Sequence, residues 1–176
     1  GDTTGEDTTA GEGTTTGEVD PEAPACSDKN PFGEPFDASA NGKYPWEKVG
    51  DLTLPTLDGD WTLSEAWSGC DSIVFLNTAP GPDYGYAQSI WDTAVDKLLG
   101  NSPPNVHYVF STFDNNNAVD TVSARKATVD AALEAMGEDA KAWWTPRIHY
   151  VTQGAFTLPG WLGETLKEKG VFWLGI

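Results

Sequence analysis

Two strand-like segments, each followed by a helical pattern, most constrain how this chain can fold. Residues 72–78 form an apolar run of strand length, and residues 106–113 are rich in β-branched and aromatic side chains. A longer helical pattern, over residues 119–136, follows the second segment. Apolar residues at helical spacing follow the first, at Ala87, Ile90, Trp91, Ala94, Val95 and Leu98. Strands that alternate with helices predict a parallel sheet, so the sequence predicts an α/β domain.

Shorter signals complete the predicted order of elements. Residues 49–57 alternate apolar and polar side chains up to the turn signal Asp58-Gly59, and residues 61–63 return, which predicts an N-terminal β-hairpin. Ser64 is expected to cap a short helical turn. Helices are predicted over residues 138–144 and 161–169. Between them, residues 147–152, a Gln153-Gly154 turn and residues 155–158 predict a second hairpin.

The strongly apolar segment 171–176 is left over after these elements. Two interpretations stay open: the segment adds a strand to a sheet edge, or the polypeptide continues beyond Ile176. We favour the second, which would make this domain an accessory module of a longer protein.

The first 25 residues differ in composition from the rest of the chain. They are mainly Gly, Thr and acidic residues, they contain no aromatic or basic residue, and Val19 is their only large aliphatic side chain. Such a segment cannot form a core, so we expect a disordered, self-repelling tether at residues 1–25 and a folded domain at residues 26–176. The tether resembles the segment behind the lipidated cysteine of bacterial surface lipoproteins; an ordinary interdomain linker is the alternative.

The charge of the chain restricts its partners. Its formal net charge is −17 at pH 7, which argues against binding to nucleic acid or anionic lipid, because both require a basic face. No apolar stretch approaches the roughly 20 residues needed to span a bilayer. We therefore expect no nucleic-acid partner and no direct membrane insertion, and a protein or peptide partner is the class that remains.

Cys26 and Cys70 are the only cysteines. An even cysteine count beside a tether of exported character favours a structural disulfide between them over two free thiols. A reactive Cys70 is the functional alternative, but it requires a neighbouring cation, and Asp71 stands beside it instead. The disulfide and the tether together predict an exported protein, which is periplasmic, a cell-surface lipoprotein or extracellular.

The turn after residues 72–78 resembles the active-site turn of thioredoxin-like proteins. That family reads Trp-Cys-Gly-Pro-Cys at such a strand-to-helix junction, and the matching residues here are Ala79, Pro80, Gly81, Pro82 and Asp83. A second likeness is Thr145-Pro146 before a predicted strand, where the family has a cis-proline that faces the active-site turn. The resemblance covers roughly residues 49–170. It implies a thioredoxin-like three-layer sandwich with an N-terminal β-hairpin extension and a cis peptide bond before Pro146.

The chain departs from this family in its chemistry. Thiol–disulfide exchange needs an attacking thiolate and a second sulfur, and the residues at the matching turn positions, Pro80 and Asp83, have neither. We therefore expect a redox-inactive domain with no cofactor. His107 and His149 lie on predicted strands and are interpreted as interior residues rather than zinc ligands. The oxygen-rich loop 114–120 lacks the glycine and distal glutamate of an EF-hand, so a helix-capping loop is favoured over a calcium site.

Aromatic residues next to Pro146 suggest where such a domain would bind a partner. Trp143 and Trp144 abut the segment that binds peptides in catalytic relatives, although they could simply cover a sheet edge. We expect a binding face made of Pro80, Asp83, Trp143, Trp144, Thr145 and Pro146, with a peptide strand pairing with the backbone of Thr145. The resulting hypothesis is a binding or structural module. The alternative is an enzyme that reuses the pocket for chemistry without a dithiol, for which Asp83 as a general base lacks a partner.

Overall fold

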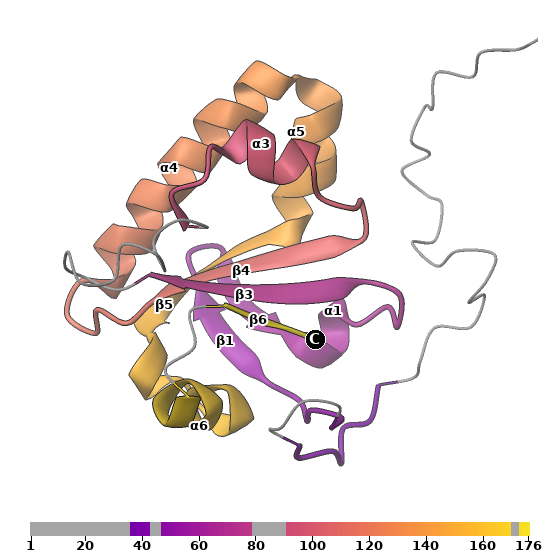
Figure 1. The fold of residues 1–176 in the computed structure, drawn as a ribbon, viewed down its shortest axis with the longest axis vertical. Helices are drawn as coiled ribbons and strands as arrows, with labels where there is room; N and C mark the ends of the chain where they lie inside the picture. The colour runs from indigo at the N-terminus through magenta and orange to yellow at the C-terminus, as the bar shows by residue number, and fades with distance from the viewer. Residues whose placement is uncertain (1–35, 43–46, 79–90, 170–172) are drawn as a thin grey trace, which may run out of the picture.

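A six-stranded mixed sheet forms the centre of the domain in the computed structural model (Figure 1). The structure describes residues 36–42, 47–78, 91–169 and 173–176. The strand order across the sheet is β2-β1-β5-β4-β3-β6. The strands are β1 (Thr53–Thr56), β2 (Gly59–Thr62), β3 (Ser72–Thr78), β4 (Val106–Thr112), β5 (Ile148–Gly154) and β6 (Trp173–Gly175).

Helices cover both faces of this sheet, so the described domain has three layers (Figure 1). One face, here called the α4 face, is covered by α3 (Val95–Gly100), α4 (Ala118–Met136) and α5 (Glu138–Trp144). The opposite face, here called the α6 face, is covered by α1 (Leu63–Ala66) and α6 (Gly160–Lys169). Two short 3-10 turns flank β5, namely η2 (Thr145–Arg147) and η3 (Ala155–Thr157). The predicted α/β class is confirmed.

Three parallel strands, β3, β4 and β5, form the middle of the sheet. β3 and β4 pair in register from Ser72 opposite Val106 to Thr78 opposite Thr112. Ile148 at the start of β5 is opposite Tyr108. The predicted N-terminal hairpin is confirmed, because β1 and β2 pair antiparallel around Gly59, whose φ of 114° suits glycine.

Strand alternation divides the core between the two faces. On β4, Val106, Tyr108 and Phe110 pack beneath the helices of the α4 face, whereas Val109 packs against the α6 face. Helix α4 turns one stripe of side chains towards the sheet: Ala118, Val122, Arg125, Val129 and Leu133. Each of these is apolar except Arg125.

The second predicted hairpin is wrong. β5 continues through Gln153 to Gly154, and residues 155–157 form the 3-10 turn η3 instead of a returning strand. The chain then enters α6 and ends in β6, which pairs antiparallel with β3 at the edge of the sheet. Residues 173–175 therefore add a strand to the sheet edge, and continuation of the polypeptide beyond Ile176 stays a prediction. After β4 the helices and strands follow in the order α4, α5, β5, α6 and β6.

One smaller prediction about a helix start also needs correction. Thr62, rather than Ser64, occupies the N-cap position of α1, and the Ser64 hydroxyl donates a hydrogen bond of 2.6 Å to Asp51 Oδ2. The N-cap residue of α4 is Asn117. The proposed tether and Cys26 lie outside the described residues.

Candidate functional site

The predicted binding residues next to Pro146 lie at the end of the sheet where β5 begins. No cis peptide bond occurs among the described residues, so the expected cis bond before Pro146 is wrong. Thr145 has φ −52° and ψ −47°, which are helical values, and it begins η2. A helical residue cannot extend a β-ladder, so a peptide strand cannot pair with the Thr145 backbone in this conformation.

The register of the parallel strands separates this end of the sheet from the end of β3. Ile148 is level with Tyr108, which is level with Val74, four residues before Thr78. At about 3.3 Å per residue, about 13 Å along the strands separate Ile148 from Thr78, and Pro146 precedes Ile148. Pro80 and Asp83, the other two predicted binding residues, follow Thr78 in sequence and lie outside the described residues.

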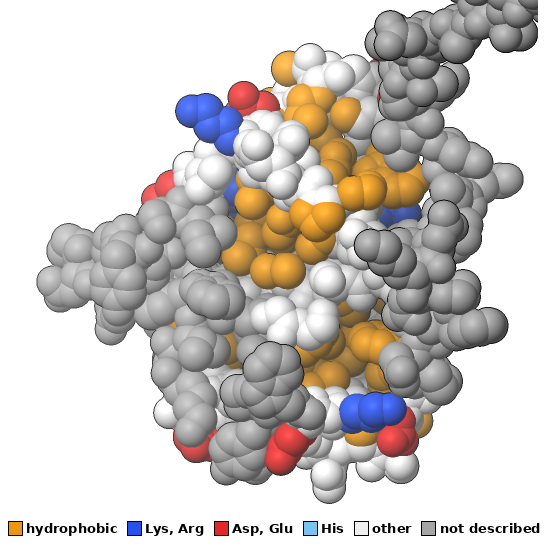
Figure 2. All heavy atoms as spheres, turned by 45° about the vertical axis from the view of Figure 1, so that its right-hand side comes forward, with side chains coloured by type: hydrophobic (Ala, Val, Ile, Leu, Met, Phe, Trp, Pro, Cys, Tyr) orange, Lys and Arg blue, Asp and Glu red, His pale blue; other side chains and the backbone are white. Residues whose placement is uncertain are grey.

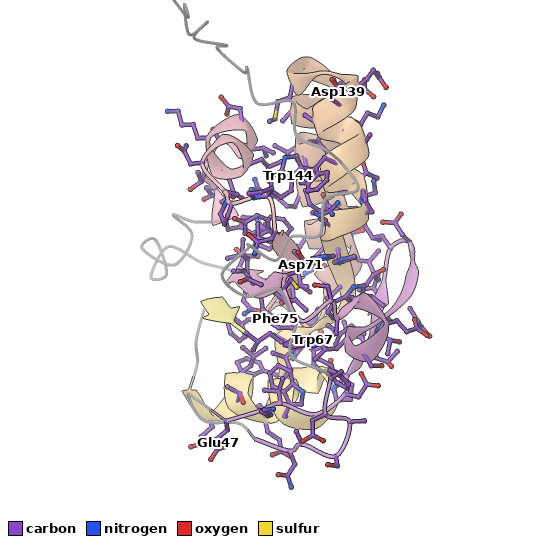
Figure 3. All side chains as sticks on the ribbon, turned by 90° about the vertical axis from the view of Figure 1, so that its right-hand side faces the viewer. Glu47, Trp67, Asp71, Phe75, Asp139 and Trp144 are labelled. Atoms are coloured by element: carbon purple, nitrogen blue, oxygen red, sulfur yellow. The ribbon has the colours of Figure 1, made fainter. Side chains whose placement is uncertain are left out.

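Trp144 is a core residue. Only 6% of its surface is exposed, and its ring packs 6.4 Å from that of Tyr108. Figure 3 places it between the helices, on the α4 side of Asp71. Trp144 cannot contact a partner without unfolding its surroundings, so its predicted role as a binding anchor is wrong.

Trp143 has the opposite environment. It is half-buried, and the Arg147 guanidinium stacks on its ring with Cζ 3.8 Å from the ring centroid. Its indole Nε1 donates a hydrogen bond of 3.2 Å to the carbonyl oxygen of Pro104. Arg147 Nη1 in turn donates to the carbonyl oxygen of Trp143 at 2.9 Å. The Arg147 stacking and the hydrogen bond to Pro104 hold the Trp143 ring in one orientation.

Figure 2 shows hydrophobic side chains gathered on the face of the molecule towards α3, α4 and α5. Val74, Leu98, Met136 and Ala140, like Trp143, are partly buried apolar residues that pack against the core beneath the α4 face. Trp143 is therefore one of several apolar side chains of this layer that keep part of their surface exposed.

A polar row crosses the α6 face near the start of the parallel strands. His107 on β4 and His149 on β5 stack with a ring separation of 5.6 Å, and His107 Nδ1 lies 3.3 Å from His149 Nε2. Asp71 Oδ2 lies 3.8 Å from His107 Nε2. Because this carboxylate favours a proton on His107 Nε2, Nδ1 accepts a hydrogen bond from Nε2–H of His149. Trp61 closes the row with its ring 5.0 Å from His149.

Both imidazoles are held in the neutral form. Burial lowers the pKa of His107, an effect that Asp71 partly opposes and the charge of Arg147 reinforces. Burial lowers the pKa of His149 to about 4, and the neighbouring His107 lowers it further. The sequence analysis interpreted both histidines as interior residues and missed that they meet. The available signal was their matching position, since each follows the first residue of a strand in the parallel sheet.

This row does not assemble a nucleophilic site among the described residues. The nearest hydroxyl is Ser68, whose Oγ donates to Asp71 Oδ2 at 2.8 Å and accepts from the backbone N–H groups of Cys70 and Asp71. Ser68 therefore contacts the carboxylate and not an imidazole base. Within the described ranges, no group of three or more metal-ligating side chains comes together.

Cys70 is disulfide-bonded, and the other cysteine of the chain is Cys26. The Cys70 carbonyl oxygen accepts a hydrogen bond of 2.8 Å from Asn105 Nδ2, which ties the residue to the loop before β4. An oxidised cysteine provides no thiolate for exchange or for metal binding.

The oxygen-rich loop before α4 folds onto its own carboxylate. Asp114 accepts hydrogen bonds from the backbone N–H groups of Asn116 and Asn117 and from the Asn117 side chain. The Asn117 side chain and the backbone of Asn116 lower the pKa of Asp114. This network gives the loop a structural role at the start of the helix.

Comparison of the chain with known proteins finds no matching family model, no matching curated protein and no matching solved structure. No helix in the described parts of the chain has the length and apolar character to cross a bilayer. The function is therefore argued from the geometry of this chain alone.

Proposed function

We propose that this domain is a redox-inactive recognition module that binds a protein or peptide through the surface around Trp143. The observation that carries the proposal is the fixed, partly exposed indole of Trp143, which is stacked on Arg147 and hydrogen-bonded to Pro104. Tryptophan and arginine are the residue types most enriched among interface residues with large energetic contributions. A ring that is already fixed loses little entropy on binding, which favours affinity.

The charge of the protein favours one class of partner. With a formal charge of −17, the chain attracts basic partners and repels acidic ones. The Trp143 ring needs an apolar or aromatic side chain to stack on. We therefore propose a partner segment that combines an apolar anchor with neighbouring basic residues. Nucleic acid is not proposed as a partner.

The proposed setting is outside the cytoplasm. A disulfide at Cys70 and an acidic Gly/Thr-rich tether both suit an exported or cell-surface protein. Kinship with thioredoxin-like proteins, as a further part of the proposal, rests on the first half of the domain, where a hairpin, a short helix and β3 are followed in the sequence by Gly81-Pro82. The second half departs from that topology, because a helix replaces the expected hairpin after β5.

Selection from a displayed library of random peptides tests this function. Peptides that bind the wild-type domain should be enriched in aromatic and basic residues, and their affinity should fall at least tenfold, about 1.4 kcal/mol, for Trp143→Ala. Phe156→Ala is the matched control, because Phe156 is 40% exposed and lies beyond the opposite end of β5. If the selected peptides bind both variants with the same affinity as the wild type, the Trp143 surface is not the binding site.

A further inference from the structure

Arg125 is a buried cation in a position where the helix pattern calls for an apolar residue. Only 7% of its surface is exposed, and it stands between Val122 and Val129 on the stripe of α4 that faces the sheet. Burial lowers its pKa, because the charged form has lost most of its water. Tyr150 and Asp92 oppose this lowering electrostatically, but no ion pair joins Asp92 to the guanidinium, so a buried cation with no anion of the described residues in direct contact needs an explanation.

The described residues supply little compensation for this charge. The single hydrogen bond of the guanidinium runs from Nη2 to the carbonyl oxygen of Thr93 at a long 3.4 Å, and Nε has no partner. No carboxylate of the described residues forms an ion pair with it. Two aromatic rings flank it instead, with Cζ 5.0 Å from the Phe110 centroid and 5.9 Å from the Trp91 centroid. These rings stabilise the cation but accept no conventional hydrogen bond, so the buried Nε–H and the second hydrogen of Nη2 remain unused as donors to the described residues.

Arg125 lies over the carboxyl-terminal half of β4. Phe110, beneath the guanidinium, lies two residues before the carboxyl end of β4, and open α/β sheets bind their ligands at the carboxyl ends of parallel strands. Thr78 and Thr112 lie side by side at these ends, on the same face as Phe110 by strand alternation. Both are buried, and the Thr78 hydroxyl has no hydrogen-bond partner.

We propose that Arg125 is the anchor of a binding site for a small carboxylate at the carboxyl ends of β3 and β4. The Nε–Nη2 edge presents two parallel N–H donors, which match the two oxygens of a carboxylate. The Thr78 hydroxyl adds a further polar group on the same face. One cation in a strongly acidic protein suits a singly charged carboxylate better than a phosphate, which carries more charge and needs more donors. This site is independent of the Trp143 surface, which lies at the other end of the parallel strands.

Nuclear magnetic resonance of the arginine Nε–H groups tests the proposal directly, because Arg125 and Arg147 are the only arginines of the chain. Titration of the full chain with sodium acetate at constant ionic strength should shift the Arg125 signal saturably and leave that of Arg147 in place. Acetate should also raise the melting temperature of the wild type. Arg125→Met and Arg125→Lys should bind acetate at least tenfold more weakly, since neither keeps the planar donor pair.

Lys126→Met provides the matched control, because it removes one positive charge from the adjacent, half-buried position of the same helix, where Lys126 pairs with Asp130 at 3.0 Å and lies 5.7 Å from the centroid of the Tyr150 ring. This variant should keep the full acetate response. An unmoved Arg125 signal, equal shifts of both arginine signals, or an acetate response that survives in both Arg125 variants would each overturn the proposal. A response to inorganic phosphate without one to acetate would overturn the assignment of a carboxylate.

Discussion

Substitution of His149 by glutamine should remove a pH-dependent part of the stability of this domain. In the folded protein the pKa of His149 is about 4, because the imidazole is largely buried and lies 3.3 Å from His107. In the unfolded chain it returns to the ordinary value of 6.5. Glutamine keeps a hydrogen-bonding side chain at this position but does not titrate.

The sign of the effect follows from proton uptake. Above pH 6.5 the imidazole is neutral in both states, so its titration contributes no pH dependence there. Below pH 6.5 the His149 imidazole binds a proton in the unfolded chain but not in the folded protein, so the free energy of unfolding falls as the pH falls. The lowering of the His149 pKa from 6.5 to about 4 corresponds to a loss of about 3 kcal/mol in the free energy of unfolding as the pH falls from 6.5 to 4. His107, whose pKa is also lowered, acts in the same direction.

Urea denaturation followed by tryptophan fluorescence, at intervals from pH 8 to pH 4, measures this loss. The acidic residues titrate in both proteins, so the informative quantity is the difference in free energy of unfolding between wild type and His149→Gln at each pH. That difference should be constant above pH 7 and should shift by about 3 kcal/mol in favour of the variant by pH 4. A difference that stays constant over the whole range would refute the buried, neutral histidine pair.

Three further predictions concern stability. Replacing Cys26 and Cys70 with serine should lower the free energy of unfolding by about 4 kcal/mol, because the loop between them is no longer closed in the unfolded chain. Guanidinium denaturation of the variant measures this loss, and denaturation of the wild type in the presence of a reductant measures it independently. Trp144→Ala should cost about 3–5 kcal/mol because it empties a core position, measured in the same assay. The hydrogen bond from the Ser64 hydroxyl lowers the pKa of Asp51, so the stability that this contact provides is lost when the carboxylate becomes protonated at acidic pH. Asp51→Asn should therefore show a smaller decrease in the free energy of unfolding than the wild type as the pH falls.

Local patterns in the sequence predicted most elements of the fold. The segments 72–78 and 106–113 became neighbouring parallel strands, and the pattern over residues 119–136 became α4, because burial on one side of an element leaves a regular apolar spacing. The second hairpin failed for a physical reason. Gln153-Gly154 is a turn signal, but the lack of a side chain at Gly154 also lets β5 run close to Asn115, whose Oδ1 would lie 1.9 Å from an added Cβ.

The candidate site was less predictable, because it depends on which side of an element each residue faces. Consecutive helical residues are turned by about 100°, so only one of Trp143 and Trp144 can face the core, and their identities do not decide which. The polar row of Asp71, His107 and His149 depends on register between segments far apart in sequence. Arg125 left a signal that we did not use, since it falls on the apolar stripe of a helix.

The central claim is that recognition takes place around Trp143 at the start of β5, and mapping a bound peptide by nuclear magnetic resonance tests it most directly. A peptide selected on the wild-type domain should, on titration, shift the indole N–H of Trp143 and the Nε–H of Arg147, whose side chains are stacked at 3.8 Å. The backbone signals of Thr78 and Thr112, at the far end of the parallel strands, should stay in place. Shifts confined to the far end, with those of Trp143 and Arg147 unchanged, would contradict the account.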